Sequence, residues 1–307
     1  MKEQMKYKKW SLRENLNLSD EKISYGLKDF IRQINLNKDK LKKIEAILQG
    51  AFQSSKSGSG FDFNEIREYK IGDDLRHISW TATARTGTLQ TKEYYAEKEI
   101  YSYFLIDVSN SMFCGNKPEP FIKSFAYLLN MAAGFSEKIG GIFFSDEIKY
   151  IFPLTHASSQ INLMFENLLS MLDGLRIENQ KKAVDQTVTN FSSALDFAKR
   201  SFLKKGFIFV ISDFINVSNW EKLAFETSRK QNICLFQIYD VLDFALPKKG
   251  YISLIDPETK KRFTVNTDSK IIQENYHNLM QDKQKKLKAF LSSIGAHHLL
   301  IEKRDFL

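Results

Sequence analysis

From Ile100 onward the chain alternates short apolar runs with longer stretches of helical periodicity, and this alternation limits the possible folds more than any other feature. An apolar run, a helix and another apolar run form the pattern of parallel strands joined by helical crossovers. The pattern predicts an α/β fold with a doubly wound, mostly parallel sheet flanked by helices. We expect strands at 101–107, 140–145, 148–152, 207–213, 233–239 and 297–302, and helices near 120–137, 159–173, 191–203, 219–230 and 269–293.

Three segments accompany this predicted domain of residues 99–307. Residues 1–60 are expected to be a helical N-terminal extension that ends in a flexible loop, because apolar residues recur at helical spacing before the Ser- and Gly-rich stretch 54–60. Residues 61–98 are expected to pack on the core. Two alternating runs around Pro257 predict a β-hairpin insertion near 247–267.

Composition narrows the class of protein. Hydrophobic residues make up 43% of the 307 positions, which is enough for a sizeable core, and no apolar run approaches the roughly 18 to 20 residues that span a bilayer. There is no apolar signal segment at the N-terminus, and only two cysteines occur, so we expect a cytoplasmic protein with free thiols. The net charge of +8 is spread along the chain, so nucleic acid is not an expected partner.

Oxygen-bearing side chains follow two of the predicted strands. Asp107, Ser109 and Ser111 come after the first strand at alternating positions, which turns their oxygens toward one side of an extended loop. Asp213 ends the fourth strand, and the segment 187–190 before a helix adds two threonines. Ligands of open parallel sheets bind at the carboxyl ends of strands, so these side chains are expected to converge there.

Carboxylate and hydroxyl oxygens without nitrogen or sulfur select a hard cation, so the expected metal is Mg²⁺ or Mn²⁺. With few charged ligands, such an ion keeps an open position for an Asp or Glu of another molecule. The alternative is ordinary helix capping, because Ser and Asp at a strand-to-helix junction are common caps.

These residues resemble the von Willebrand factor A domain and its metal-ion-dependent adhesion site, Asp-x-Ser-x-Ser followed by a Thr and an Asp. Thr189 fits that Thr better than Thr187, because it opens a Thr-x-x-x-x-Ala-Leu helix start. Asn110 stands where the family commonly has Gly, and Asn is the residue that next best tolerates a left-handed backbone. The resemblance implies the ligand set Asp107, Ser109, Ser111, Thr189 and Asp213.

A second stretch, residues 67–85, resembles the signature of the bacterial family called domain of unknown function 58, which couples it to a von Willebrand A-like domain. Ser79 and Thr83 depart from the family's common Asp and Ser. A Gly-Asp-Asp turn clamped by arginines, with Trp80 anchored in the core, is expected to be structural, with partner docking as the alternative. The residues concerned are Arg67, Tyr69, Gly72, Asp73, Asp74, Arg76, Trp80 and Arg85.

The resemblance implies a non-enzymatic, metal-dependent protein-binding module, an adaptor or co-chaperone that works with a MoxR-type AAA+ ATPase. The alternative is a metal-dependent phosphohydrolase, since an Asp beside Mg²⁺ can act as nucleophile or activate water. A haloacid-dehalogenase-like enzyme needs a second Asp where Ser109 stands. A third possibility, a basic nucleic-acid or membrane-surface binder, depends only on charge and on Lys-rich helices.

Overall fold

The computed structural model describes residues 27–32, 34–40, 42–47, 63–94, 99–178, 189–215, 217, 219–256 and 262–306. The chain divides into two compact units. One unit contains Tyr101–Leu307 together with the residues up to Lys42, and the other is Lys43–Ile100. The first unit carries the predicted α/β domain.

A six-stranded sheet forms the centre of the first unit, in the order β10-β7-β6-β3-β4-β5. Five strands are parallel, and β5 pairs antiparallel with β4 at one edge. The mostly parallel α/β fold is therefore confirmed. The strands are β3 (Tyr101–Asp107), β4 (Lys138–Phe144), β5 (Ile148–His156), β6 (Gly206–Ser212), β7 (Asn232–Ile238) and β10 (His297–Ile301).

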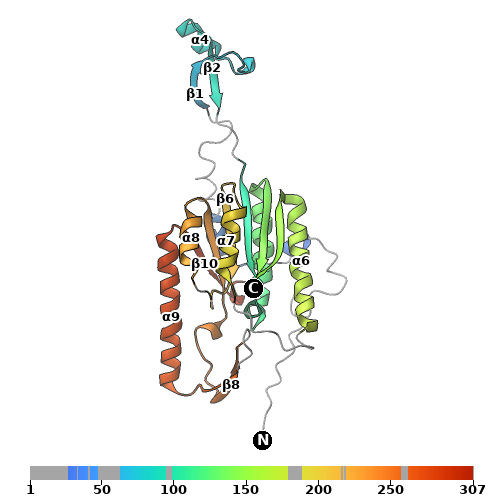
Figure 1. Ribbon diagram of the computed structural model, residues 1–307, viewed down its shortest axis with the longest axis vertical. Coiled ribbons are helices and arrows are strands. Elements are labelled where there is room, and N and C mark those ends of the chain that lie inside the picture. Colours follow the sequence, from blue (N-terminus) through green and yellow to red (C-terminus); the bar gives the residue numbers. More distant parts are fainter. Residues whose placement is uncertain are drawn as a thin grey trace. The chain divides into compact units, whose positions relative to one another are not determined.

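Helices cover both faces of this sheet (Figure 1). Helix α2 packs with α5 and α6, whereas α7 packs with α8. Helix α9 precedes β10 and contacts it. The helices are α2 (Leu27–Arg32), α5 (Pro118–Phe135), α6 (Ala157–Glu178), α7 (Phe191–Ser201), α8 (Glu221–Ser228) and α9 (Lys270–Ser293), with short 3-10 turns η3 (Asn110–Phe113), η4 (Val241–Asp243) and η5 (Lys303–Asp305).

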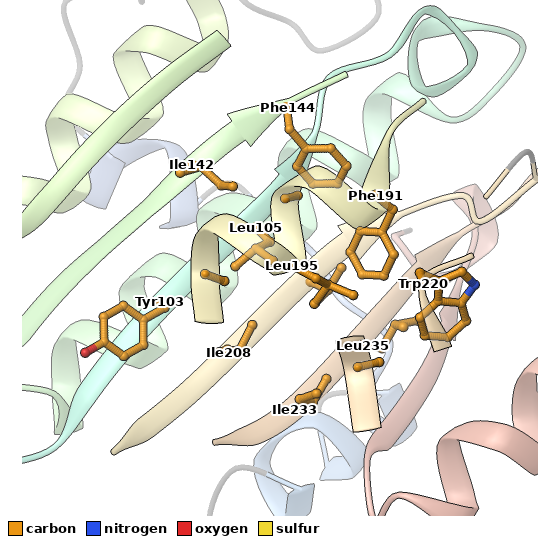
Figure 2. Packing of buried hydrophobic residues seen from close by; sticks show 14 of the residues in the cluster. Tyr103, Leu105, Ile142, Phe144, Phe191, Leu195, Ile208, Trp220, Ile233 and Leu235 are labelled. Carbon is orange, nitrogen blue, oxygen red and sulfur yellow. The ribbon is translucent and has the colours of Figure 1, made fainter. Parts of the chain in front are cut away.

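Alternating side chains of the strands pack on opposite faces. Leu105 of β3 belongs to the cluster under α7, which Figure 2 shows with Leu195 and Ile208. Its neighbour Phe104 lies with its ring 6.0 Å from that of Phe125 in α5. Because helices bury both faces, all seven residues of β3 are buried, which explains its continuous apolar run.

A β-hairpin and an N-terminal helix accompany the sheet. Strands β8 (Tyr251–Ile255) and β9 (Arg262–Asn266) pair antiparallel, so the hairpin is confirmed, while its turn at 257–261 lies outside the described residues. Helix α2 docks on the α/β domain, with the rings of Phe30 and Phe165 5.1 Å apart. The Ser- and Gly-rich stretch 54–60 also lies outside the described residues.

The second unit is a small β-hairpin with a helix. Strands β1 (Phe63–Glu68) and β2 (Gln90–Tyr94) pair antiparallel, and η2 (Leu75–His77) and α4 (Trp80–Thr86) lie between them in sequence. Helix α4 ends at Gly87, which adopts the left-handed backbone that glycine favours. How this unit packs on the α/β domain stays a prediction.

Candidate metal centre

Asp107 lies at the carboxyl end of β3, next to the end of β6. The two strands are parallel neighbours with Ile106 opposite Ile211, so the residues that follow them meet at one edge. The Ser212 hydroxyl donates to Asp107 Oδ2 at 2.5 Å, and the Ser109 amide donates to Asp107 Oδ1 at 2.9 Å. Asp107 is only 1% exposed, so its carboxylate is held rigidly inside the protein.

The two serines of the first loop lie together. Ser109 Oγ and Ser111 Oγ are 3.1 Å apart, and both residues are buried. Ser109 precedes η3, but its side chain makes no capping hydrogen bond. Asn110 begins the 3-10 turn η3 with a negative φ, so the tolerance of Asn for a left-handed backbone is not needed in this loop.

Thr189 comes from the loop that enters α7. The amide of the next residue, Asn190, donates to the Ser145 carbonyl at 2.7 Å, and Ser145 directly follows β4, the neighbour of β3. Asn190 also caps α7 by accepting from the Ser193 amide at 3.0 Å. Thr189 is thus buried at the same edge of the sheet without serving as the helix cap, whereas Thr187 lies outside the described residues.

Asp213 has a partner that sequence reasoning missed. Lys117 Nζ lies 2.8 Å from Asp213 Oδ2 and 3.1 Å from Asp243 Oδ2, and the Lys117 and Asp213 side chains are about 5% and 4% exposed. Lys117 is the N-cap of α5, where the helix dipole disfavours a cation. A lysine directly before the helix-starting Pro118 is unfavourable for the helix dipole, which is the one weak sequence signal of its acidic partners.

Burial sets the electrostatics of this edge. Burial, and secondly the charge of Asp213, raise the pKa of the Asp107 carboxyl to about 7. Burial lowers the pKa of Lys117, but the charges of Asp213 and Asp243 outweigh the effect of burial. The pKa of Lys117 therefore lies above its ordinary value. Burial also raises the pKa of Asp243. A further cation beside Asp107 would stabilise its ionised form.

The donor set fits a hard divalent cation. Asp107, Ser109, Ser111 and Asp213 offer oxygen atoms only, which is the chemistry that Mg²⁺ and Mn²⁺ prefer. Within the described ranges, no three His, Cys, Asp or Glu side chains gather as a metal-binding group. Any ion here would therefore depend on hydroxyl groups and on ligands supplied from outside the chain.

A groove opens beside Asp213. Its volume is about 350 Å³, and its walls include Trp220 and Phe290, whose rings pack edge to face at 5.0 Å. Lys283 and Lys286 of α9 also line it. The groove therefore combines an apolar wall with positive charge next to the candidate centre.

The residues of the signature segment form two ion pairs. Arg67 binds Asp73 through both carboxylate oxygens at 2.8 and 2.9 Å, and Arg76 binds Asp74 at 2.6 Å. The Arg67 hydrogen bonds lower the pKa of Asp73 to about 2, although the pair is near the surface. Gly72, at φ 108°, lies in the turn that the Asp73 amide closes by donating to the Lys70 carbonyl at 3.0 Å. The predicted arginine clamp is present for these two arginines.

Two members of this segment do not behave as expected. Trp80 is 70% exposed at the start of α4, so it does not anchor its own unit by burial. Arg85 lies in the last turn of the same helix, and no bond to Asp73 or Asp74 includes it. Ile71, Leu75 and Leu89 of the same unit are exposed as well.

A match to a known protein family shows to which family the chain belongs. A family described as "Protein of unknown function DUF58" matches residues 65–286, which include both the signature segment and the candidate centre. The chain belongs to this family. Uncharacterized protein Rv1480 of Mycobacterium tuberculosis is 22% identical to this DUF58 chain over 221 residues, 71% of this chain and 67% of that protein. Uncharacterized protein Mb1516 of Mycobacterium bovis matches equally.

Solved structures similar to this DUF58 protein have low sequence identity. An aerotolerance-related membrane protein from Bacteroides fragilis is 14% identical, covering 67% of this chain and 93% of its own, with a TM-score of 0.43. Manganese-loaded Plasmodium vivax TRAP protein is 15% identical, covering 46% and 57%, with a TM-score of 0.33. No helix among the described residues has the length and apolarity to cross a membrane.

Proposed function

We propose that this DUF58 protein is a non-enzymatic protein-binding module that depends on a divalent metal ion. The observation that carries the proposal is the meeting of Asp107, Ser109, Ser111 and Asp213 at the carboxyl edge of a parallel sheet, with Thr189 in the adjoining loop. These residues would hold Mg²⁺ or Mn²⁺. The metal would supply an electrophilic position for a carboxylate of a partner protein.

The groove beside Asp213 gives such a partner a second point of contact. A partner segment with an Asp or Glu next to an apolar side chain would place the acid at the metal and the apolar group against Trp220. Lys283 and Lys286 would attract its negative charge. From the family resemblance, we propose a MoxR-type AAA+ ATPase or its client as this partner, with the chain acting as adaptor or co-chaperone.

The test is binding of this chain to a purified MoxR-type ATPase encoded in the same genome, measured in Mg²⁺ and in chelator. We expect binding that disappears in chelator and in Asp107→Ala, because both remove the metal. Asp73→Ala, which changes a carboxylate in the other unit, is the matched control and should bind like the wild type. Binding that is equal in Mg²⁺ and in chelator would refute the metal dependence.

A metal-dependent phosphohydrolase remains the second candidate because of one observation, the buried Lys117 beside Asp213. A lysine next to a metal can stabilise the charge of a transferring phosphoryl group. However, Ser109 occupies the place of the acid that would protonate the leaving group, and its hydroxyl faces Ser111. We expect no Mg²⁺-dependent release of phosphate from p-nitrophenyl phosphate, and metal-dependent turnover lost in Asp107→Ala would favour the enzyme.

A further inference from the structure

Lys117 places a fixed positive charge at the candidate metal centre. Its Nζ contacts a predicted metal ligand, Asp213, and also Asp243, which comes from the loop after β7. The side chains of Lys117 and Asp213 are only 5% and 4% exposed to solvent. Water cannot replace the carboxylates around an ammonium group this deeply buried, so the ion pair between Lys117 and Asp213 persists as long as the protein is folded.

The turn before Lys117 is built to keep it in place. Asp240 Oδ2 accepts a hydrogen bond from the Asn116 amide at 2.7 Å, and the Asp240 amide donates to Asp243 Oδ2 at 2.8 Å. Gly115 has φ 62°, and a Cβ there would lie 2.6 Å from Asp240 Oδ2. The turn therefore needs glycine, both for its backbone and for the close approach of Asp240.

We infer that Lys117 is a built-in counter-cation of the metal centre, which holds Asp213 in the metal-free protein and weakens the binding of a divalent ion. This inference depends on the proposed metal site. Two positive charges at Asp213 repel each other, so the charge of Lys117 opposes the binding of the metal ion. The free protein then holds metal weakly, and a partner's carboxylate would supply the negative charge that the centre lacks.

The inference is tested by calorimetric titration of Mg²⁺ and of Mn²⁺ into chelator-treated protein. Lys117→Gln removes the charge and keeps a hydrogen-bond donor, whereas Lys117→Arg keeps the charge. We expect Lys117→Gln to bind metal at least about tenfold more tightly than the wild type, and Lys117→Arg to bind like the wild type. Lys123→Met, which removes a lysine of α5 that pairs with Glu119, is the control and should change nothing.

A second measurement separates the effect of Lys117 on metal affinity from its effect on the stability of the fold. Thermal melting without metal should show that Lys117→Met is less stable than the wild type, because Asp213 and Asp243 lose their counter-charge. Saturating Mg²⁺ should restore more of the melting temperature in this variant than in the wild type. A structural role alone would lower stability without any change in metal affinity.

The outcomes distinguish this inference from the proposed function. If the wild type binds metal and Lys117→Gln binds it less than about tenfold more tightly, the counter-cation inference is wrong and the metal site stands. If Lys117→Gln binds and the wild type does not, the inference is supported in its strongest form. If no variant binds either ion, the proposed metal site fails, and the inference fails with it.

Discussion

The protein carries two sets of aspartates in opposite physical situations. Asp107 and Asp213 are buried at the end of a parallel sheet, and burial raises the pKa of Asp107 to about 7. Asp73 and Asp74 lie in the small second unit, where the hydrogen bonds of Arg67 and Arg76 hold the pKa of each carboxyl below its ordinary value. In the buried set, Lys117 pairs with Asp213 and also with Asp243, while uncharged groups donate to Asp107. In the second unit, each aspartate has its own arginine.

This difference indicates which set can bind a ligand. A carboxylate with an arginine on both of its oxygens, as in Asp73, has no remaining demand for a cation. Asp107 accepts hydrogen bonds from the Ser212 hydroxyl and the Ser109 amide, which carry no charge, and it lies beside the charge of Asp213. The buried set is therefore the better candidate for a metal ion, while each aspartate of the other set is held by an arginine.

The largest expected effect is the loss of a buried partner. Asp213→Ala leaves the Lys117 ammonium with Asp243 alone, and we expect the free energy of unfolding to fall by about 3 kcal/mol, as for other broken buried pairs. Urea denaturation followed by circular dichroism measures it. Asp74→Ala breaks an exposed pair and is the matched control. Equal losses in the two variants would contradict the contrast between the sets.

A smaller effect should come from His298 of β10. Burial, and secondly the charge of Lys288, lower its pKa to about 4, and its Nε2 lies 3.0 Å from Gln237 Oε1. The unfolded chain takes up a proton near pH 6.5 and the folded protein only near 4, so the contribution of neutral His298 to stability is present above pH 6.5 and lost between 6.5 and 4.

The pH dependence isolates this histidine when wild type and His298→Gln are compared. The difference between their unfolding free energies should shift by about 1 to 2 kcal/mol between pH 7 and pH 4, after allowance for partial exposure. Urea denaturation at several pH values measures the shift. Parallel curves for the two proteins across this range would show that the histidine is not desolvated.

The smallest effect is expected in the signature segment. Arg67→Lys keeps the charge but loses the two-oxygen grip on Asp73, so the midpoint of unfolding should change only slightly. Because the pKa of Asp73 is lowered, the pair contributes above about pH 4 and loses its contribution as the pH falls toward 2. Metal affinity should remain that of the wild type, and a loss of affinity would connect the two regions.

Much of the fold followed from the apolar runs. Strands β3 and β6 are buried on both faces, so their sequences are mostly apolar, and the polar residues at their carboxyl ends had to lie at one edge. Lys117 could not be found this way, because Asp243 reaches it from a loop distant in sequence. Trp80 is exposed within its own unit, so its predicted packing on the α/β domain stays a prediction.

Metal binding at Asp107 is the central property proposed for this protein. Calorimetric titration of Mg²⁺ and Mn²⁺ into chelator-treated wild type, Asp107→Ala and Asp73→Ala tests it, with Lys117→Gln included so that weak binding is not overlooked. We predict saturable binding in Lys117→Gln, weaker binding in wild type and Asp73→Ala, and none in Asp107→Ala. Binding that survives in Asp107→Ala, or its absence from all four proteins up to millimolar metal, would contradict the account.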